Sequence, residues 1–199
     1  LGYPSWQDYQ KTFDYNSNAY LGAIIGPIAG RIAKARIPFQ ADAFQFEANE
    51  GQHLLHGGKT CFSNVNWKLQ SCEEEPYPQV TFFVETVAYN IALPGNLRAE
   101  VTYTLKEYEL AIQIKCIAIE DTIANPTQHA YFNPGGQQAS ILDSEIWMHT
   151  QGYLKLNSEK LPTGETIRLK HKEDFIKPIN LLALSFYPQI DNAFVLNQA

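Results

Sequence analysis

The residues best suited to proton transfer lie in the stretch Asn125 to Gly136, which reads NPTQHAYFNPGG. It holds one imidazole, His129, among amides, a hydroxyl and two aromatic rings. An imidazole has an unperturbed pKa of ~6.5 and can exchange a proton near neutral pH when a substrate oxygen lies within hydrogen-bond reach. A histidine at a strand end more often satisfies nearby backbone groups, so this stretch alone leaves both interpretations open.

Two further imidazoles lie in GQHLLHGG, residues 51–58, where His53 and His56 are three positions apart. The flanking glycines favour a loop and permit close approach of the backbone to a ligand. A zinc site needs further ligands at suitable spacing, and the sequence supplies none convincingly, so no metal is predicted. A solvated loop histidine remains the alternative for either residue.

Two charged side chains complete the candidates. Arg31 follows Gly30 in the apolar stretch GPIAGRI, residues 26–32, where a charged fork must be paired, exposed or directed at a ligand. This stretch contains neither GxGxxG nor GxxxxGK[ST], so it does not predict a phosphate cradle. Asp191 precedes the apolar run of residues 194–196 and, taken alone, is typical of a turn.

Strand patterns dominate the segments that must position these residues. Residues 97–105 alternate apolar and polar side chains, residues 110–119 resume the alternation after a short polar link, and together they predict an antiparallel hairpin. Residues 80–87 are apolar on both faces, as in a central strand. Residues 5–11 and 180–184 are short helix candidates. The whole pattern predicts an all-β protein with packed sheets.

The bulk composition fits a single globular domain over residues 1–199. The formal net charge is −6 and no basic patch is visible, so no nucleic-acid partner is predicted. No apolar run approaches the ~20 residues that span a bilayer, so no membrane partner is predicted either. Three cysteines without CxxC spacing are typical of reduced thiols in a cytoplasmic protein.

Several segments, taken in order, resemble the aldose 1-epimerase (galactose mutarotase) family. They are YLGAIIGPIAGRI, NEGQHLLHGG, LPGNLRAEVTYTL, NPTQHAYFNPGG, ILDSE, LPTGE and DNAFVL. Each motif alone is weak, and their shared order over nearly the whole chain carries the resemblance. It implies a β-supersandwich of mostly antiparallel twisted sheets. It also implies interconversion of the α and β anomers of free aldoses such as galactose or glucose, with no metal or organic cofactor.

The resemblance also implies roles for the candidate residues. By motif match, His129 takes the position of the general acid that protonates the ring oxygen. His56 matches the histidine that binds the sugar and supports charge at that oxygen. Arg31 and Asp191 match residues that hydrogen-bond the sugar. The chemistry agrees, because imidazoles and a guanidinium stabilise an oxygen that gains negative charge and a carboxylate accepts from hydroxyls.

Departures from the family pattern bear on activity. Pro27 stands where many relatives have arginine and Gly30 where many have asparagine, so the sugar preference is open. The family's general base is a glutamate beyond the late aspartate, so the base is expected beyond Ala199. The family's N-terminal strands are missing too, and both ends of the chain look internal to a longer protein. The 199-residue chain alone is therefore expected to be nearly inactive.

Two other functions stay open from the sequence. A non-catalytic carbohydrate-binding protein can share the fold, because one fold hosts unrelated functions. An epimerase acting on a phosphorylated or disaccharide sugar is the other, and a phosphate would need a basic cluster, for which Arg31, Lys34 and Arg36 are the nearby candidates. A homodimer is also left open.

Overall fold

The computed structural model describes residues 1–11, 19–89, 91–136, 139–169, 175, 177–183 and 191–197. The chain divides into two compact units, a larger one of residues 2–130 and a smaller one of Leu1 with residues 131–199. A single domain over residues 1–199 stays a prediction.

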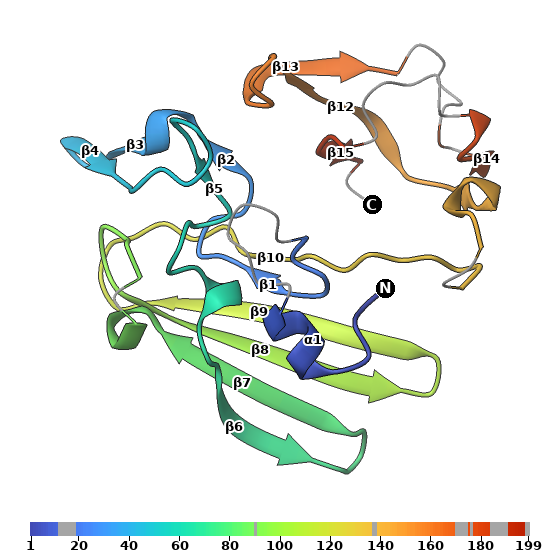
Figure 1. The fold of residues 1–199 in the computed structure, drawn as a ribbon, viewed down its shortest axis with the longest axis horizontal. Coiled ribbons are helices and arrows are strands. Elements are labelled where there is room, and N and C mark those ends of the chain that lie inside the picture. Colours follow the sequence, from blue (N-terminus) through green and yellow to red (C-terminus); the bar gives the residue numbers. More distant parts are fainter. Residues whose placement is uncertain are drawn as a thin grey trace. The chain divides into compact units, whose positions relative to one another are not determined.

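Strands make up most of the regular structure (Figure 1). In the larger unit they are β1 (Ile24–Ile25), β2 (Arg31–Ile32), β3 (Arg36–Phe39), β4 (Asp42–Gln45), β5 (Leu54–Leu55), β6 (Lys68–Glu73), β7 (Gln79–Glu85), β8 (Leu97–Lys106), β9 (Glu109–Ala118) and β10 (Thr127–Gln128). Its helical segments are α1 (Trp6–Lys11) and the 3-10 turns η1 (Ala33–Ala35), η2 (Phe62–Asn64) and η3 (Thr86–Tyr89). The smaller unit has η4 (Ile141–Asp143), β11 (Glu145–Ile146), β12 (Thr150–Leu156), β13 (Pro162–Arg168), β14 (Ile179–Asn180) and β15 (Phe194–Leu196). The predicted all-β, mostly antiparallel class is confirmed, since every ladder between these strands is antiparallel.

The largest sheet has the order β6-β7-β8-β9. β8 and β9 form the predicted hairpin, paired from Leu97 opposite Ala118 to Lys106 opposite Glu109. β7 lies between β6 and β8, as its apolar residues on both faces predict. The remaining pairs in this unit, β1-β10, β2-β5 and β3-β4, are short ladders outside that sheet.

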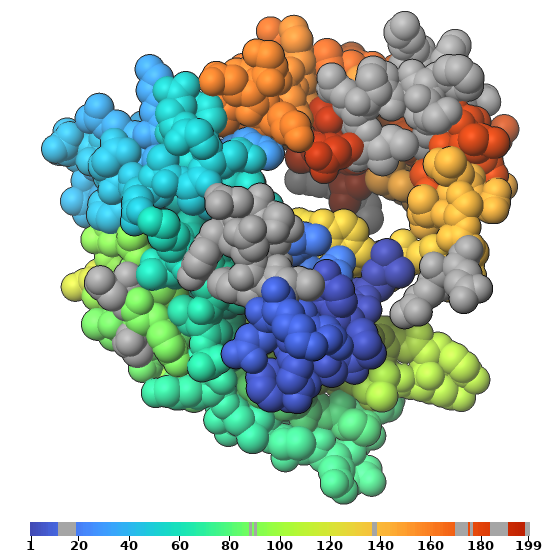
Figure 2. Space-filling model, viewed as in Figure 1, coloured from blue at the N-terminus to red at the C-terminus, as the bar shows by residue number. Residues whose placement is uncertain are grey.

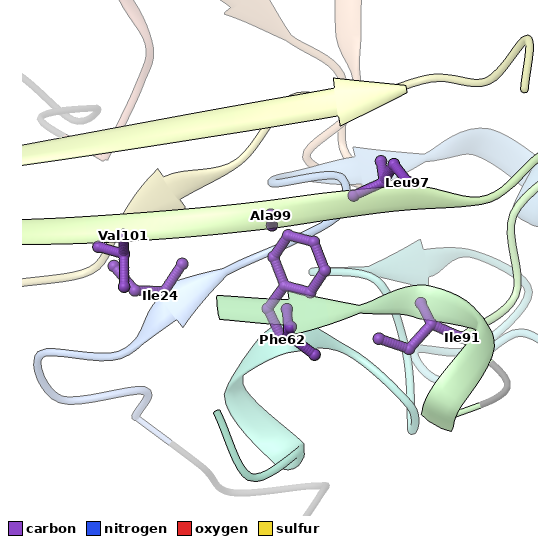
Figure 3. Packing of buried hydrophobic residues seen from close by; sticks show 7 residues of the cluster. Ile24, Phe62, Ile91, Leu97, Ala99 and Val101 are labelled. Carbon is purple, nitrogen blue, oxygen red and sulfur yellow. The ribbon is translucent and has the colours of Figure 1, made fainter. Parts of the chain in front are cut away.

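One face of this sheet carries the main core of the larger unit. Leu97, Ala99 and Val101 alternate along β8 and are at most 3% exposed, whereas the residues between them are only half-buried. The ring of Phe62, from η2, packs in this cluster together with Ile24 of β1 (Figure 3). Burial of these apolar side chains anchors β1 to the large sheet, and β1 in turn pairs with the strand that leads to His129.

The helix prediction for residues 5–11 is confirmed as α1. The Asp8 N–H donates to the Ser5 hydroxyl at 3.3 Å, the expected N-terminal cap. None of its residues is buried, and in Figure 2 it stands at the surface as a dark blue protrusion. Among the described residues, no helix is long and apolar enough to cross a membrane.

The smaller unit has a three-stranded sheet of order β13-β12-β15 and the pair β11-β14. The helix prediction for residues 180–184 is wrong at Asn180, which lies in β14 opposite Glu145. Its side-chain oxygen accepts from the Leu182 N–H at 2.9 Å, so the asparagine ends a strand with a local turn instead of starting a helix. Leu184, the end of that prediction, lies outside the described residues.

Candidate active site

His129 lies at the end of β10, where backbone hydrogen bonds hold it against the glycine-rich segment. Its N–H donates to the Ala23 carbonyl at 2.9 Å, and its carbonyl accepts from the Gly22 N–H at 3.0 Å. Both backbone groups of His129 are therefore paired with the glycine-rich segment, which fixes the position of its Cα. The side chain is half-buried.

His56 follows β5, which pairs with β2 and so brings it beside Gly30. The His56 N–H donates to the Gly30 carbonyl at 3.0 Å, and the Gly30 N–H donates to His56 Nδ1 at 3.1 Å. Because Nδ1 accepts, the neutral imidazole carries its proton on Nε2, which becomes a hydrogen-bond donor. The φ of His56 is +55°, and Gly57 and Gly58 continue the left-handed turn at +83° and +78°.

Three aromatic rings meet at this place. The ring centroids of His56 and His129 are 5.5 Å apart at an interplanar angle of 85°. The Tyr20 ring lies 5.0 Å from His56 and 5.8 Å from His129, on a backbone whose φ of +53° is uncommon for a bulky residue. Burial, and then the Cys61 thiol and the Glu50 carboxylate, raise the pKa of Tyr20 above its usual 10.0, so its hydroxyl stays protonated at neutral pH.

Arg31 forms a bidentate ion pair with Glu50. Its Nε and Nη2 donate to the two carboxylate oxygens at 2.5 and 2.7 Å. Glu50 lies in a tight turn closed by backbone bonds with His53. The Asn49 amide at the start of this turn donates to the Leu55 carbonyl at 3.0 Å and accepts from the Leu55 N–H at 2.7 Å. The turn is therefore tied to β5, opposite Arg31 in β2.

The other histidine of GQHLLHGG has a structural role. His53 is 7% exposed, and its Nδ1 accepts from the Lys34 N–H at 3.0 Å. His53 thus supports η1, while His56 enters the ring cluster. Across the described ranges, no three His, Cys, Asp or Glu side chains are grouped so that they could hold a metal ion.

Asp191 belongs to the smaller unit. It is exposed at a bend before β15, and the neighbouring Asn192 side chain donates to the Leu154 carbonyl of β12 at 2.7 Å. This setting agrees with its prediction as a turn residue. The sugar-binding role that the resemblance implies for Asp191 stays a prediction.

Tyr20 and Glu50 lie at the site although sequence reasoning assigned them no role. Glu50 is 19 positions after Arg31, and their contact depends on the β2-β5 pairing, which no local spacing encodes. The position of Arg31 in an apolar stretch required that it be paired, exposed or directed at a ligand. That requirement indicated a possible carboxylate partner but did not identify which one. Tyr20 precedes the glycines of its motif and gave no signal of a left-handed backbone.

The larger unit thus brings His56, His129 and Arg31 to one place. The arrangement places a donor on His56 Nε2 beside a second imidazole, which suits proton transfer to an oxygen that gains charge, and Arg31 enters it already paired with Glu50. These features define the class as an antiparallel β protein with a candidate site built around two imidazoles.

Comparisons with known proteins identify the family. The family model described as Aldose 1-epimerase matches residues 2–199. Mouse (Mus musculus) galactose mutarotase is 34% identical over 164 residues, which cover 81% of this chain and 47% of the mouse protein. Streptococcus thermophilus aldose 1-epimerase is 30% identical over 200 residues, covering 98% of this chain and 56% of that protein. The chain belongs to the aldose 1-epimerase family.

The solved structures agree with this assignment. Galactose 1-epimerase from Lactobacillus acidophilus matches with a TM-score of 0.83 at 26% identity, over 100% of this chain and 60% of that chain. The GalM/aldose epimerase homologue from C. elegans matches with a TM-score of 0.82 at 23% identity, which supports the fold alone. The predicted family and fold are confirmed. The chain spans about half the length of the curated relatives it matches.

Proposed function

We propose that the protein is an aldose 1-epimerase that interconverts the α and β anomers of a free aldose. The observation that carries the proposal is the T-shaped, edge-to-face packing of His56 and His129, with ring centroids 5.5 Å apart and an interplanar angle of 85°. Both imidazoles sit on backbone fixed by hydrogen bonds to the glycine-rich segment. Family membership supports the same reaction class.

In this proposal His129 acts as the general acid. It donates its proton to the ring oxygen as the bond between C1 and that oxygen breaks, and the electron pair goes to the oxygen. A carboxylate base removes the proton of the anomeric hydroxyl, which leaves a C1 aldehyde. Rotation about the C1–C2 bond and reclosure then give the other anomer. His56 Nε2–H stabilises the charge on the ring oxygen, while Arg31 and Asp191 bind the sugar.

Polarimetry tests the proposal directly. The purified full-length protein should speed the decay of optical rotation of fresh α-D-galactose or α-D-glucose. Failure to accelerate any aldose would refute the enzymatic function and favour a carbohydrate-binding protein.

A substitution tests the role of the acid. His129→Asn should lower turnover by about 10²–10⁴-fold and change sugar affinity far less, because asparagine can hydrogen-bond but cannot transfer the proton. His53→Asn is the matched control, since an amide oxygen can replace Nδ1 as the acceptor for the Lys34 N–H. Turnover retained in His129→Asn would exclude His129 as the acid.

The preferred sugar, the location and the assembly of the protein are also proposals. We infer galactose or glucose as the substrate, a cytoplasmic location and a homodimer as one candidate assembly. Initial rates with each sugar and the mass of the protein in solution test the first and the last.

A further inference from the structure

We propose that Glu50 restricts the site to uncharged aldoses by neutralising the guanidinium of Arg31. The inference rests on the proposed function, because it concerns which sugars the same site accepts. It assigns a specificity-determining role to a residue that lies in the motif NEGQHLLHGG but to which the family resemblance assigns no role.

The geometry of the ion pair carries the argument. Glu50 occupies the Nε and Nη2 edge of the Arg31 guanidinium, with both oxygens at 2.5 and 2.7 Å. That two-donor edge is what a phosphate or carboxylate would use for bidentate binding. An anionic sugar must therefore displace the Glu50 carboxylate or approach a guanidinium whose charge is already balanced. A neutral hydroxyl meets no such opposition.

The pair is fixed by the fold around it. Arg31 lies in β2 opposite Leu55 of β5, and Asn49, next to Glu50, makes two hydrogen bonds to the backbone of the same Leu55. Backbone bonds with His53 close the turn that carries Glu50. Both partners of the ion pair are thus attached to one strand pair, so the contact does not depend on two mobile surface side chains.

A second ion pair nearby in sequence shows the contrast. Lys59 and Glu47 also pair, but their side chains are 56% and 71% exposed. The side chains of Arg31 and Glu50 are 20% and 39% exposed. Screening by solvent is weaker at the more buried pair, so its charge balance has the larger effect on a bound ligand.

The charge of Glu50 also reaches the imidazole cluster. Burial is the main cause that raises the pKa of Tyr20, and the Glu50 carboxylate adds to it. The Tyr20 ring packs against both His56 and His129. The Glu50 carboxylate therefore lies within electrostatic reach of the ring cluster.

The test compares wild type with Glu50→Gln. Glutamine keeps the size but turns one oxygen into an NH₂ group, which faces a guanidinium donor, so the bidentate contact and the charge balance are both lost. Affinities for D-galactose, D-galacturonate and inorganic phosphate are measured by titration calorimetry on the full-length protein. Glu50→Gln should bind both anions about tenfold more tightly than wild type, with a smaller change for galactose. Inorganic phosphate makes the test independent of the pose of the sugar.

Glu47→Gln is the matched control, because it removes a carboxylate from the exposed pair. An unchanged anion affinity in a folded Glu50→Gln, or an equal gain in Glu47→Gln, would overturn the inference.

If Glu50→Gln does not fold, the inference is tested on the wild type by measuring how its affinity for galacturonate depends on ionic strength. A balanced pair predicts that galacturonate binds no more tightly at low ionic strength than at high, whereas tighter binding at low ionic strength contradicts it. Calorimetry measures binding without turnover, so failure of the Glu50 inference can be told apart from failure of the proposed function, which polarimetry tests.

Discussion

Replacing Gly57 with alanine is expected to displace the turn that holds His56, because the added methyl group has no room. An ideal Cβ at Gly57 would lie 2.6 Å from the Gly26 carbonyl oxygen and 3.0 Å from Cys61 Cβ. The Gly26 carbonyl is backbone and already accepts from the Phe62 N–H at 2.8 Å. The turn itself must therefore shift to relieve the contact.

The cost in free energy of unfolding has two parts. A φ of +83° costs a residue with a side chain about 1–2 kcal/mol, and overpacking against backbone adds about 1–3 kcal/mol. Gly57→Ala should therefore lose about 2–5 kcal/mol. Gly58→Ala is the matched control, since its φ is +78° but its Cβ would lie 3.0 Å from the end of the Leu54 side chain and at an ordinary contact distance of 3.9 Å from the Glu47 carbonyl oxygen. Gly58→Ala should therefore lose mainly the about 1–2 kcal/mol that comes from the positive φ.

Urea unfolding and polarimetry measure the two consequences. With a slope of about 1–3 kcal/mol per molar urea, an overpacking cost of about 1–3 kcal/mol places the midpoint of Gly57→Ala about 0.3 M or more below that of Gly58→Ala. Turnover should also fall further in Gly57→Ala, because a displaced turn lengthens the 3.1 Å bond from the Gly30 N–H to His56 Nδ1. Equal midpoints would refute the packing argument, and wild-type turnover would refute the link to His56.

Three further predictions concern single residues. Tyr20→Phe keeps the ring that packs on both imidazoles and should keep more turnover than Tyr20→Ala. Polarimetry should show a loss of ~10-fold or more in turnover for Tyr20→Ala. Equal losses in the two variants would assign the effect to the hydroxyl. Burial raises the pKa of Cys61 above 9.0. As pH rises, the Cys61 thiol of the unfolded chain therefore loses its proton at a lower pH than that of the folded chain. The stability is unaffected below pH ~9 and falls as pH rises toward the folded pKa, and urea midpoints in Cys61→Ser should fall less over that range. Gly30 has a φ of +78° and open space at Cβ, and asparagine tolerates that conformation. Gly30→Asn should thus cost less than ~1 kcal/mol. It should also bind galactose more tightly in calorimetry, since it supplies the amide that the family resemblance implies at this position. Weaker binding would contradict this.

Long alternating strands could be predicted from the sequence, and their one clear error has a local cause. The predicted strands 97–105 and 110–119 match β8 and β9 within a residue, because burial on one face imposes a period of two. The prediction for residues 80–87 runs past the end of β7, where Thr86 starts η3. The Thr86 hydroxyl accepts from the Leu97 N–H at 3.0 Å and donates to its carbonyl at 3.2 Å. This side chain takes over pairing with β8 and ends the strand.

The site could be predicted only where a motif carried it. His56 and His129 were found through the resemblance, and the structure brings their rings together. The strands that do so, β1, β2, β5 and β10, have two residues each, too few for any periodicity. The partner of Arg31 depends on that pairing, so Glu50 could not be found from local sequence. Tyr20 depends on a left-handed backbone, which aromatic residues rarely adopt.

The small, apolar residues of the glycine-rich segment, residues 20–32, serve to hold the two histidines and do not form a phosphate cradle. Its backbone binds His129 through Gly22 and Ala23 and binds His56 through Gly30. Close approach needs small residues, as a Cβ at Gly26 would lie 2.3 Å from the ring of Phe62 in the core. Both imidazoles therefore depend on one stretch of chain, and a local opening of that stretch would release them together while the large sheet stayed folded. Activity should accordingly be lost before the sheet unfolds as denaturant is raised.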